Sequence, residues 1–377
     1  MIRSVSVMNV HLPLRKPFQL LEVDFHVMEF TLVILEQGHR TGVGALTVFP
    51  GYSDTTMDNL WQFARGKGGV IIGEDPRWAL GHLSMESDPS LLCATPFIVA
   101  LEALLGSIPG PDMPEYPLSG RVLENREPHI SEEVISLLEQ GFRTLKVEGG
   151  RDVEADIQRV KRIRSLAGQT TGIRLDAHEG YSFDEARNFL EGVESTSIEL
   201  LEQPFPREEW EKTATLAEWS PIPIMLDESI RGEEDLKRAA SMGCCQYVKC
   251  NLMRSCSFGG LIQHIQRSRE LGFQVVVGND VGCEMECYYE AMAAASLGVR
   301  NSGDMNGFLL QREPLLERPL SVRHGCLVPP PEGISMLNHT VLERYVVNRI
   351  RWAGSEDIEP PPSKGGLRKS LVKEKSH

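Results

Sequence analysis

The sequence lacks the features that would place this chain on nucleic acid or in a membrane. It has no basic excess: 53 acidic residues outnumber 39 basic ones, for a formal net charge of −14, which opposes nonspecific binding to nucleic acid and anionic membranes. No apolar run approaches the roughly 18 residues of a membrane span, and Met1 to Gln19 alternates polar with apolar residues instead of forming a signal-peptide core. We therefore expect a cytoplasmic protein that acts on small molecules or other proteins.

The eight cysteines lack the paired CxxC spacing of structural zinc sites. We interpret them as reduced thiols packed in a core, because free cysteine is among the most buried residue types. A reactive thiol at Cys283 or Cys287 is the alternative, since both follow a predicted strand end.

The first 120 residues have the pattern of an α+β unit. Alternating and β-rich runs predict an antiparallel sheet, and helical periodicity follows in Met57 to Phe63 and Pro96 to Leu105. The expected strands are Ser4 to Leu14, Val27 to Glu36 and Gly42 to Val48. Several prolines between Pro109 and Pro117 mark the exit from this unit.

Residues 121–327 alternate short apolar strands with amphipathic helices, which predicts repeated βα units and a parallel sheet. The expected strands are Thr144 to Val147, Gly172 to Asp176, Ile198 to Glu202, Ile222 to Asp227, Tyr247 to Asn251 and Gln274 to Gly278. Asp176, Glu202 and Asp227 are 25 or 26 residues apart, about one βα unit each, which favours a closed barrel. A doubly wound open sheet is the alternative, but no glycine-rich dinucleotide loop follows the first strand.

Beyond the barrel region, residues 328–353 are expected to return to the N-terminal unit. Residues 354–377 are rich first in proline and then in lysine. We interpret them as a disordered tail.

Three carboxylates end apolar runs, at Asp176, Glu202 and Asp227. Their side chains are therefore expected at the carboxyl ends of neighbouring parallel strands, about 5 Å apart, on the face where barrels carry active sites. Like charges packed this closely usually take a cation between them, and hard cations such as Mg²⁺ prefer oxygen ligands. The sequence thus predicts one Mg²⁺ held by these three residues. Unrelated acids that cap helices or begin loops are the alternative for any single one of them.

The residues around these acids resemble a known family. The segments Arg174 to His178, Glu199 to Pro204 and Met225 to Ser229 are similar to the three metal-ligand motifs of the enolase superfamily, in its muconate-lactonizing and mandelate-racemase-like branch. The Glu-Gln-Pro run followed one unit later by Asp-Glu-Ser is highly specific. The resemblance implies a modified (β/α)7β TIM-type barrel, with an α+β capping domain formed by the N-terminal region and a C-terminal segment.

The resemblance also implies a reaction. Mg²⁺, with Mn²⁺ as a possible substitute, would bind a small carboxylate substrate, and a base would remove the α-proton to give a stabilised enolate. Racemisation or epimerisation, cycloisomerisation or dehydration would follow. The resemblance further implies a homo-oligomer. The alternative is a divergent metal-binding barrel that holds a carboxylate ligand and has lost acid/base catalysis.

The chain departs from the family where the bases are expected. The branch usually carries Lys-X-Lys on the second barrel strand and a lysine on the sixth. Here the second strand reads Lys146-Val147-Glu148, and the sixth places Asn251 at the lysine position, with Lys249 one layer deeper.

Three hypotheses stay open. In the first, Glu148 or Lys146 is the base and Lys249 or His178 the acid. In the second, Asp280 takes part after the last strand. In the third, proton-transfer catalysis has been lost.

Substrate contacts are expected from residues around the same mouth. His178 follows Asp176 by two residues, where the family often has a polar residue that contacts substrate, and Asn251 and Asn279 are further candidates. Capping-domain loops near Pro17 to Asp24 and Val48 to Asp54 would shield the site from water, through Phe18, Phe25, Phe49 and Tyr52. An interdomain core is the alternative for these aromatic residues.

Overall fold

The computed structural model describes residues 1–20, 23–49, 55–87, 90–110, 114–193, 198–279, 281–334 and 336–354. Three sequence-based predictions fall outside these ranges: the role of Asp280, the role of Tyr52 and the disorder of the tail from residue 355 onward. The side chain of Phe18 is outside them as well.

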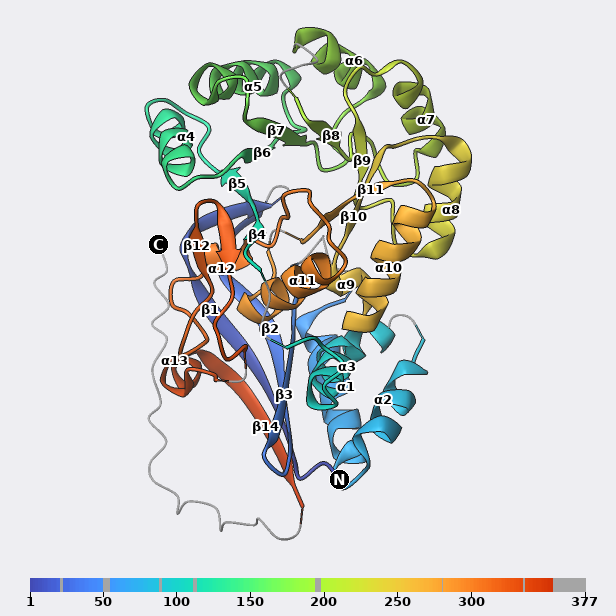
Figure 1. The fold of residues 1–377 in the computed structure, drawn as a ribbon, viewed down its shortest axis with the longest axis vertical. Coiled ribbons are helices and arrows are strands. Elements are labelled where there is room, and N and C mark those ends of the chain that lie inside the picture. The colour runs from blue at the N-terminus through green and yellow to red at the C-terminus, as the bar shows by residue number, and fades with distance from the viewer. Residues whose placement is uncertain are drawn as a thin grey trace, which may run out of the picture.

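The capping domain is built on an antiparallel sheet with the order β14-β1-β2-β3. Its strands are β1 (Ser4–Leu20), β2 (Val23–Gln37), β3 (Arg40–Thr47) and β14 (Val346–Ala353). Ser4 pairs with Ala353, so a segment from the far end of the described chain completes the N-terminal sheet, as expected (Figure 1). Alternate residues of β1 and β2, namely Val5, Val7, Val33 and Leu35, pack in one apolar cluster with residues of the domain's helices.

Helices cover this sheet: α1 (Met57–Ile71), α2 (Pro76–Ser84) and α3 (Ser90–Leu104). Thr56 and Asp75 cap the first two through side-chain oxygens that accept backbone N–H groups. Helix α3 is buried almost all round. Its close approach to β3 requires glycine, since a Cβ at Gly42 would lie 2.0 Å from the carbonyl oxygen of Ala100.

The barrel has a parallel sheet with the order β11-β10-β9-β8-β7-β6-β5 in the described residues. Its strands are β5 (Ser119–Val122), β6 (Thr144–Glu148), β7 (Gly172–Asp176), β8 (Leu200–Glu202), β9 (Ile224–Leu226), β10 (Tyr247–Cys250) and β11 (Gln274–Val277). Helices connect them, and in Figure 1 most of these helices form an arc from α4 to α10 around the strands. These are α4 (His129–Glu139), α5 (Val153–Ala167), α6 (Phe183–Gly192), α7 (Trp210–Trp219), α8 (Glu233–Met242), α9 (Leu252–Ser255) and α10 (Phe258–Glu270).

A short extended segment closes the ring between β11 and β5. The amide of Asp304 donates to Val277, and the amide of Ser119 donates to Gly303, both at 2.8–2.9 Å. Leu118 and Gly303 form a parallel bridge. Residues 303–304 therefore take the eighth place, which makes the arrangement the (β/α)7β barrel that the sequence predicts.

Helix α11 (Glu284–Ser296) joins the barrel to the capping domain. Glu286 accepts hydrogen bonds from the amide of Thr47 at 3.1 Å, and the amide of Cys283 donates to the hydroxyl of Thr47 at 3.0 Å. On the other side, Glu102 of α3 accepts the amides of Phe258 and Gly259 at the start of α10, at 2.8 and 2.9 Å. The two domains are thus tied by buried polar contacts as well as by a shared apolar core.

The remaining elements lie after α11. They are α12 (Gly307–Leu310), β12 (Ser321–Arg323), β13 (Cys326–Val328) and α13 (His339–Tyr345), and β13 pairs with β4 (Tyr116–Pro117). No helix of the described residues is both long enough and apolar enough to cross a bilayer.

Candidate active site

The inner face of the barrel carries alternate residues of each strand. Leu200, Met225 and Val276, with Tyr247 packed against them, form a small apolar cluster of their own. Two residues farther along the same strands come Glu202, Asp227 and Lys249. The inward positions therefore change from apolar to charged towards the carboxyl ends of the strands, and polar chemistry gathers at that end.

Register places the first two predicted ligands side by side. Asp176 pairs with Glu202 across β7 and β8, and Glu148 pairs with Asp176 across β6 and β7. Asp227 directly follows β9, the next strand in the sheet. The three predicted ligands thus stand on consecutive strands, all buried.

Two buried lysines form ion pairs with these acids. The Nζ of Lys146 lies 2.8 Å from Asp176 Oδ2 and 3.1 Å from Glu202 Oε2. The Nζ of Lys249 lies 2.5 Å from Glu202 Oε1 and 3.0 Å from Asp304 Oδ2. Both lysines are at most 1% exposed, so neither ammonium reaches open space and both serve as fixed counter-charges.

Arg254 gives Asp227 a different partner. Its guanidinium forms an ion pair with the carboxylate of Asp227 and donates to the backbone oxygen of the same residue at 2.8 Å. Arg254 is in α9, which Asn251 begins by accepting the amide of Arg254 at 2.9 Å. Burial would raise the pKa of Asp227, but the charges of Arg254 and Lys249 outweigh it and lower that pKa.

Glu202 behaves in the opposite way. Burial raises its pKa well above the usual range, and the negative charges of Asp176 and Asp227 add to the rise despite both lysines. The centre of the acid cluster therefore favours additional positive charge.

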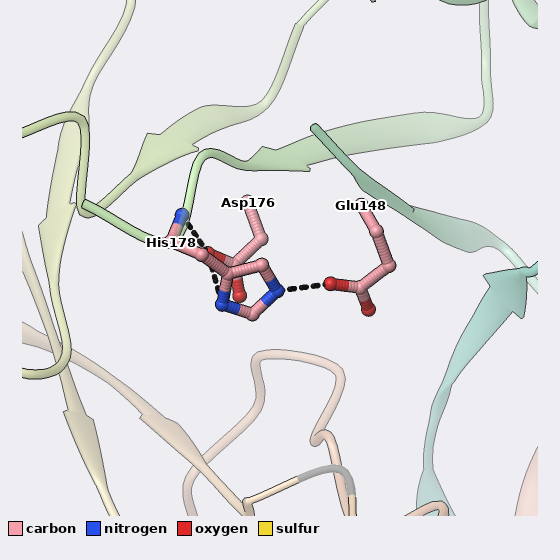
Figure 2. A group of neighbouring side chains, drawn as sticks. All are labelled: Glu148, Asp176 and His178. Atoms are coloured by element: carbon pink, nitrogen blue, oxygen red, sulfur yellow. Dashed lines mark hydrogen bonds and ion pairs between the residues drawn. The ribbon is translucent and has the colours of Figure 1, made fainter. Parts of the chain in front are cut away.

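Glu148, Asp176 and His178 form a second cluster at the mouth. Figure 2 shows the imidazole of His178 between the two carboxylates: Nε2 is hydrogen-bonded to Glu148 Oε2, and Nδ1 lies 3.4 Å from Asp176 Oδ1. Nδ1 is also 3.8 Å from Glu228 Oε1. On the far side of Glu148, Arg121 donates to Oε1 at 2.8 Å.

The charges of this cluster can be assigned from its surroundings. Burial would lower the pKa of His178, but Asp176 and Glu148 raise it well above the usual value. Burial would likewise raise the pKa of Glu148, yet Arg121 and His178 together hold it well below the usual value. The pair is therefore an imidazolium hydrogen-bonded to a carboxylate, with one proton between the two groups.

The backbone holds His178 in an uncommon conformation. His178 and Glu179 have φ of 45° and 63°, a region that residues other than glycine seldom adopt. The amide of His178 donates to Asp176 Oδ1 at 3.0 Å. A Cβ at Gly150 would lie 1.9 Å from the carbonyl oxygen of Ala177, so the neighbouring loop needs glycine to pass. Strain of this kind at a strand end is typical of functional sites.

A cavity of about 390 Å³ opens beside this pair. Its lining includes Glu148 and His178, Pro17 from the capping domain, and Arg151 and Arg159 from the loop and helix after β6. Side-chain exposure is 21% for Glu148 and 16% for His178, against at most 1% for both lysines. Among these candidate acid/base groups, the Glu148–His178 pair is the one that a ligand in the cavity reaches.

Asp176, Glu202 and Asp227 fit a divalent cation by their donor chemistry. All three offer carboxylate oxygens, which Mg²⁺ prefers, and Lys146 already bridges two of them. In the described residues, the group that brings one donor atom from each of three residues within 4.8 Å is Glu148, Asp176 and His178. Because both ring nitrogens of His178 face carboxylates, we interpret that group as a hydrogen-bonded relay instead of a metal site.

The other predicted site residues take separate positions. Asn251 is fully buried directly after β10, and its Nδ2 has no hydrogen-bond partner in the described residues. Asn279 uses its side-chain oxygen to accept the amides of Val281 and Gly282 at 3.3 and 2.9 Å, which shapes the turn after β11. Phe25 packs edge-on against Phe49, with 4.9 Å between ring centroids, at the edge of the core that the two domains share.

Six of the eight cysteines are buried, among them Cys283 and Cys287. Burial raises the pKa of both thiols well above the usual value. They are therefore protonated and poorly nucleophilic at neutral pH, which favours the packing role over a reactive thiol.

Sequence reasoning missed three charged residues of the site. Arg121 and Arg254 contact Glu148 and Asp227, and Asp304 contacts Lys249. Alternation of β5 could have pointed to Arg121 had that strand been assigned. Asp304 contacts Lys249 because residues 303–304 close the barrel between β11 and β5.

Comparison with known proteins decides the family. The sequence model described as "Enolase C-terminal domain-like" matches residues 129–336, more than half of the chain. This chain belongs to the enolase superfamily. Its place is in the muconate-lactonizing and mandelate-racemase-like branch, as the motifs at Asp176, Glu202 and Asp227 predict.

Relatives of this enolase-superfamily chain include epimerases. It is 26% identical over 317 residues to an aromatic dipeptide epimerase of Herpetosiphon aurantiacus, covering 79% of this chain and 87% of that protein. It is 29% identical over 164 residues to an L-Ala-D/L-Glu epimerase of Francisella tularensis, covering 43% and 45%. The matched segment thus spans about half the length of that second relative.

Solved structures confirm the fold. A dipeptide epimerase from Cytophaga hutchinsonii, in complex with Mg and the dipeptide D-Ala-L-Val, superposes with a TM-score of 0.83 at 20% identity. The match covers 93% of this chain and 99% of that one. The barrel and the capping domain therefore share one architecture with it.

Proposed function

We propose that this chain is a Mg²⁺-dependent enzyme that removes the proton α to the carboxylate of a small acid, with an isomerase-type or lyase-type outcome. The observation that carries the proposal is the Glu148–His178 pair, which lines a cavity with residues of the loops after β6 and β7 and whose imidazole lies 3.4 Å from the buried carboxylate of Asp176. The epimerase relatives support the same class of chemistry. They also disfavour a barrel that only binds its ligand.

The proposed ion is held by Asp176, Glu202 and Asp227. When bound, it would supply positive charge that stabilises the enolate form of the substrate carboxylate. The raised pKa of Glu202, caused by burial and by its acidic neighbours, supports this position, because the cluster binds positive charge more readily than a lone buried acid would. Mn²⁺ is an alternative ion with the same oxygen preference.

The chain's own groups divide the remaining work. Glu148 is the base, because it is a carboxylate that lines the cavity, and Arg121 fixes its orientation from behind. His178 holds the proton next to Glu148 and can return it to the substrate. Lys146 and Lys249 stay in place as buried cations that balance the acids. Asp280 is not needed in this scheme.

The test is exchange of the α-proton in D₂O with Mg²⁺, using dipeptides, N-acyl amino acids, acid sugars and simple carboxylic acids. We expect deuterium at the α-carbon of at least one compound class, and a loss of about 100-fold or more in Glu148→Gln, as general-base removal usually costs. Glu154→Gln, an exposed acid in the first turn of α5, is the matched control. Silence across the whole library would contradict the proposal.

A binding measurement separates the metal from the chemistry. Titration calorimetry with MgCl₂ should show one site in the wild type and in Glu148→Gln. It should show none, or a much weaker one, in Asp176→Asn. Assembly into a homo-oligomer and a cytoplasmic location stay predictions of the sequence.

A further inference from the structure

The two sides of the barrel mouth carry different chemistry. Strands β6 and β10 are separated by β7, β8 and β9 on one side of the ring, and by β11, residues 303–304 and β5 on the other. They therefore face each other across the barrel. A substrate held above the buried acids would present one face to β6 and the opposite face to β10.

The β6 side offers a group that can transfer a proton. Glu148 ends β6, and its hydrogen bond to His178 places a carboxylate and an imidazole together beside the cavity. Figure 2 shows both side chains at the ends of neighbouring strands, with the ring of His178 turned towards Glu148.

The β10 side offers a hydrogen-bond donor that cannot transfer a proton. Strand alternation turns Asn251 the same way as Lys249, which contacts Glu202 and Asp304 inside the barrel. Asn251 Oδ1 is occupied as the cap of α9, whereas Nδ2 is buried with no hydrogen-bond partner in the described residues. A buried amide N–H₂ without a partner costs stability unless a ligand accepts from it.

The cations near Asn251 do not supply a second base. Lys249 lies deeper in the barrel, 1% exposed, with its ammonium between Glu202 and Asp304. Arg254 is engaged with Asp227 and, being a guanidinium, does not give up its proton in proteins.

We infer that this enzyme transfers protons on one face of its substrate only, with Glu148 and His178 on that face and Asn251 donating a hydrogen bond to the substrate's carboxylate or enolate oxygen from the other. The inference rests on the proposed function and narrows it. The α C–H bond breaks, Glu148 takes the proton, and the electron pair passes to the carboxylate oxygens as an enolate. The enolate then regains a proton on the same face, or its electrons expel a β-substituent.

The substrate class follows from this asymmetry. Inversion at the α-carbon by two opposed bases is excluded for the described groups, although the relatives are named epimerases. Acids that undergo β-elimination or cycloisomerisation fit instead, because both need proton removal on one face only. The chain thus keeps the barrel of its relatives and differs from a two-base epimerase in its stereochemical course.

The test uses the D₂O assay with each enantiomer of the dipeptides and N-acyl amino acids supplied separately, followed by chiral chromatography. We expect exchange from one enantiomer with retained configuration, and exchange from the other at least about 100-fold slower, since it lacks a positioned acid/base group. Loss of a β-substituent from one enantiomer alone supports the inference equally. Comparable exchange from both enantiomers with racemisation would overturn it and leave the proposed function standing.

Two variants sharpen the result. Asn251→Lys places an ammonium opposite Glu148 and should add exchange from the second enantiomer, whereas retained one-sided exchange would show that position 251 does not face the α-carbon and would overturn the inference. If the wild type exchanges both enantiomers and Asp280→Asn loses one of them, Asp280 is a second base and the inference is wrong. Silence with every compound would remove the proposed function and this inference together.

Discussion

The acids at the barrel mouth and the acids of helix α11 are equally buried, yet they have different partners. Asp176, Glu202 and Asp304 form ion pairs with the side chains of Lys146 and Lys249. Glu284 and Glu286 of α11 accept backbone amides, from residues 315, 316 and 320 and from residues 47 and 283. Amide donors belong to the fold itself, so the α11 acids organise the chain while the mouth acids stay available for chemistry.

The largest effect is expected at α11. Glu286→Ala leaves the amide and hydroxyl of Thr47 as buried donors without their acceptor, and the amide of Cys283 keeps only the hydroxyl of Thr47. We expect the free energy of unfolding to fall by about 3 kcal/mol or more, as each unsatisfied buried group costs roughly 1–3 kcal/mol. Urea unfolding measures it. Glu218→Ala, on the exposed side of α7, should change little, and equal effects from the two variants would contradict the structural role.

A mouth acid should respond differently. Because burial and acidic neighbours raise the pKa of Glu202, the neutral isostere in Glu202→Gln relieves repulsion in the metal-free protein. We expect the unfolding free energy in EDTA to change much less than in Glu286→Ala, while Mg²⁺ affinity falls sharply through loss of ligand charge. Calorimetric titration and urea unfolding on the same samples test both parts. If Glu202→Gln is severely destabilised and its Mg²⁺ affinity is unchanged, Glu202 has the structural role that we assign to the α11 acids, and the prediction is wrong.

Different surroundings also shift the pKa of two histidines in opposite directions, and one of these shifts predicts how stability depends on pH. Acids raise the pKa of His178, whereas burial and the nearby charge of Arg254 lower the pKa of His264 to about 4. Between about pH 6.5 and 4 the unfolded chain binds a proton at position 264 that the folded protein does not. His264 should therefore reduce stability as the pH falls through this window, with no effect above it. Urea midpoints from pH 4.5 to 7.5 should show a shallower acid slope in His264→Gln, and unchanged slopes would contradict the assignment.

The smallest effect is expected from the carboxyl of Glu286 as it titrates. Burial raises its pKa in the folded state, so the folded protein holds this proton more tightly than the unfolded chain. The contribution of the Glu286 carboxyl to the free energy of unfolding is therefore complete below about pH 4.5. It declines as the pH rises through the pKa of this carboxyl in the folded protein. Glu286→Gln should gain stability relative to the wild type over that range, measured by urea unfolding at pH 4.5 and 7. If the wild type instead gains stability relative to Glu286→Gln between pH 4.5 and pH 7, the prediction is wrong.

Much of this fold was predictable because the signals are local. Three apolar runs each end in an acid, at Asp176, Glu202 and Asp227. The first two runs correspond to β7 and β8, and the third corresponds to β9 with Asp227 directly after it. The capping strands followed from alternation in the same way. Each of these predictions depends on the periodicity of one segment alone.

What could not be predicted depends on closure of the ring. Asp304 lies in a short extended piece whose partners, β5 and β11, are far away in sequence. Arg254 reaches Asp227 because Asn251 starts α9 at the right place. Likewise, the hydrogen bond between Glu148 and His178 depends on the positive φ of His178. The residue type alone does not predict that backbone conformation.

The pairing of Ser4 with Ala353 has a consequence for biosynthesis. Strand β1 is synthesised before every barrel strand, but its neighbour β14 is synthesised only after all of them. The backbone groups on one edge of β1 therefore have no strand partner while the barrel is being translated. We expect the nascent chain to be most prone to aggregation, and most dependent on chaperones, in that interval.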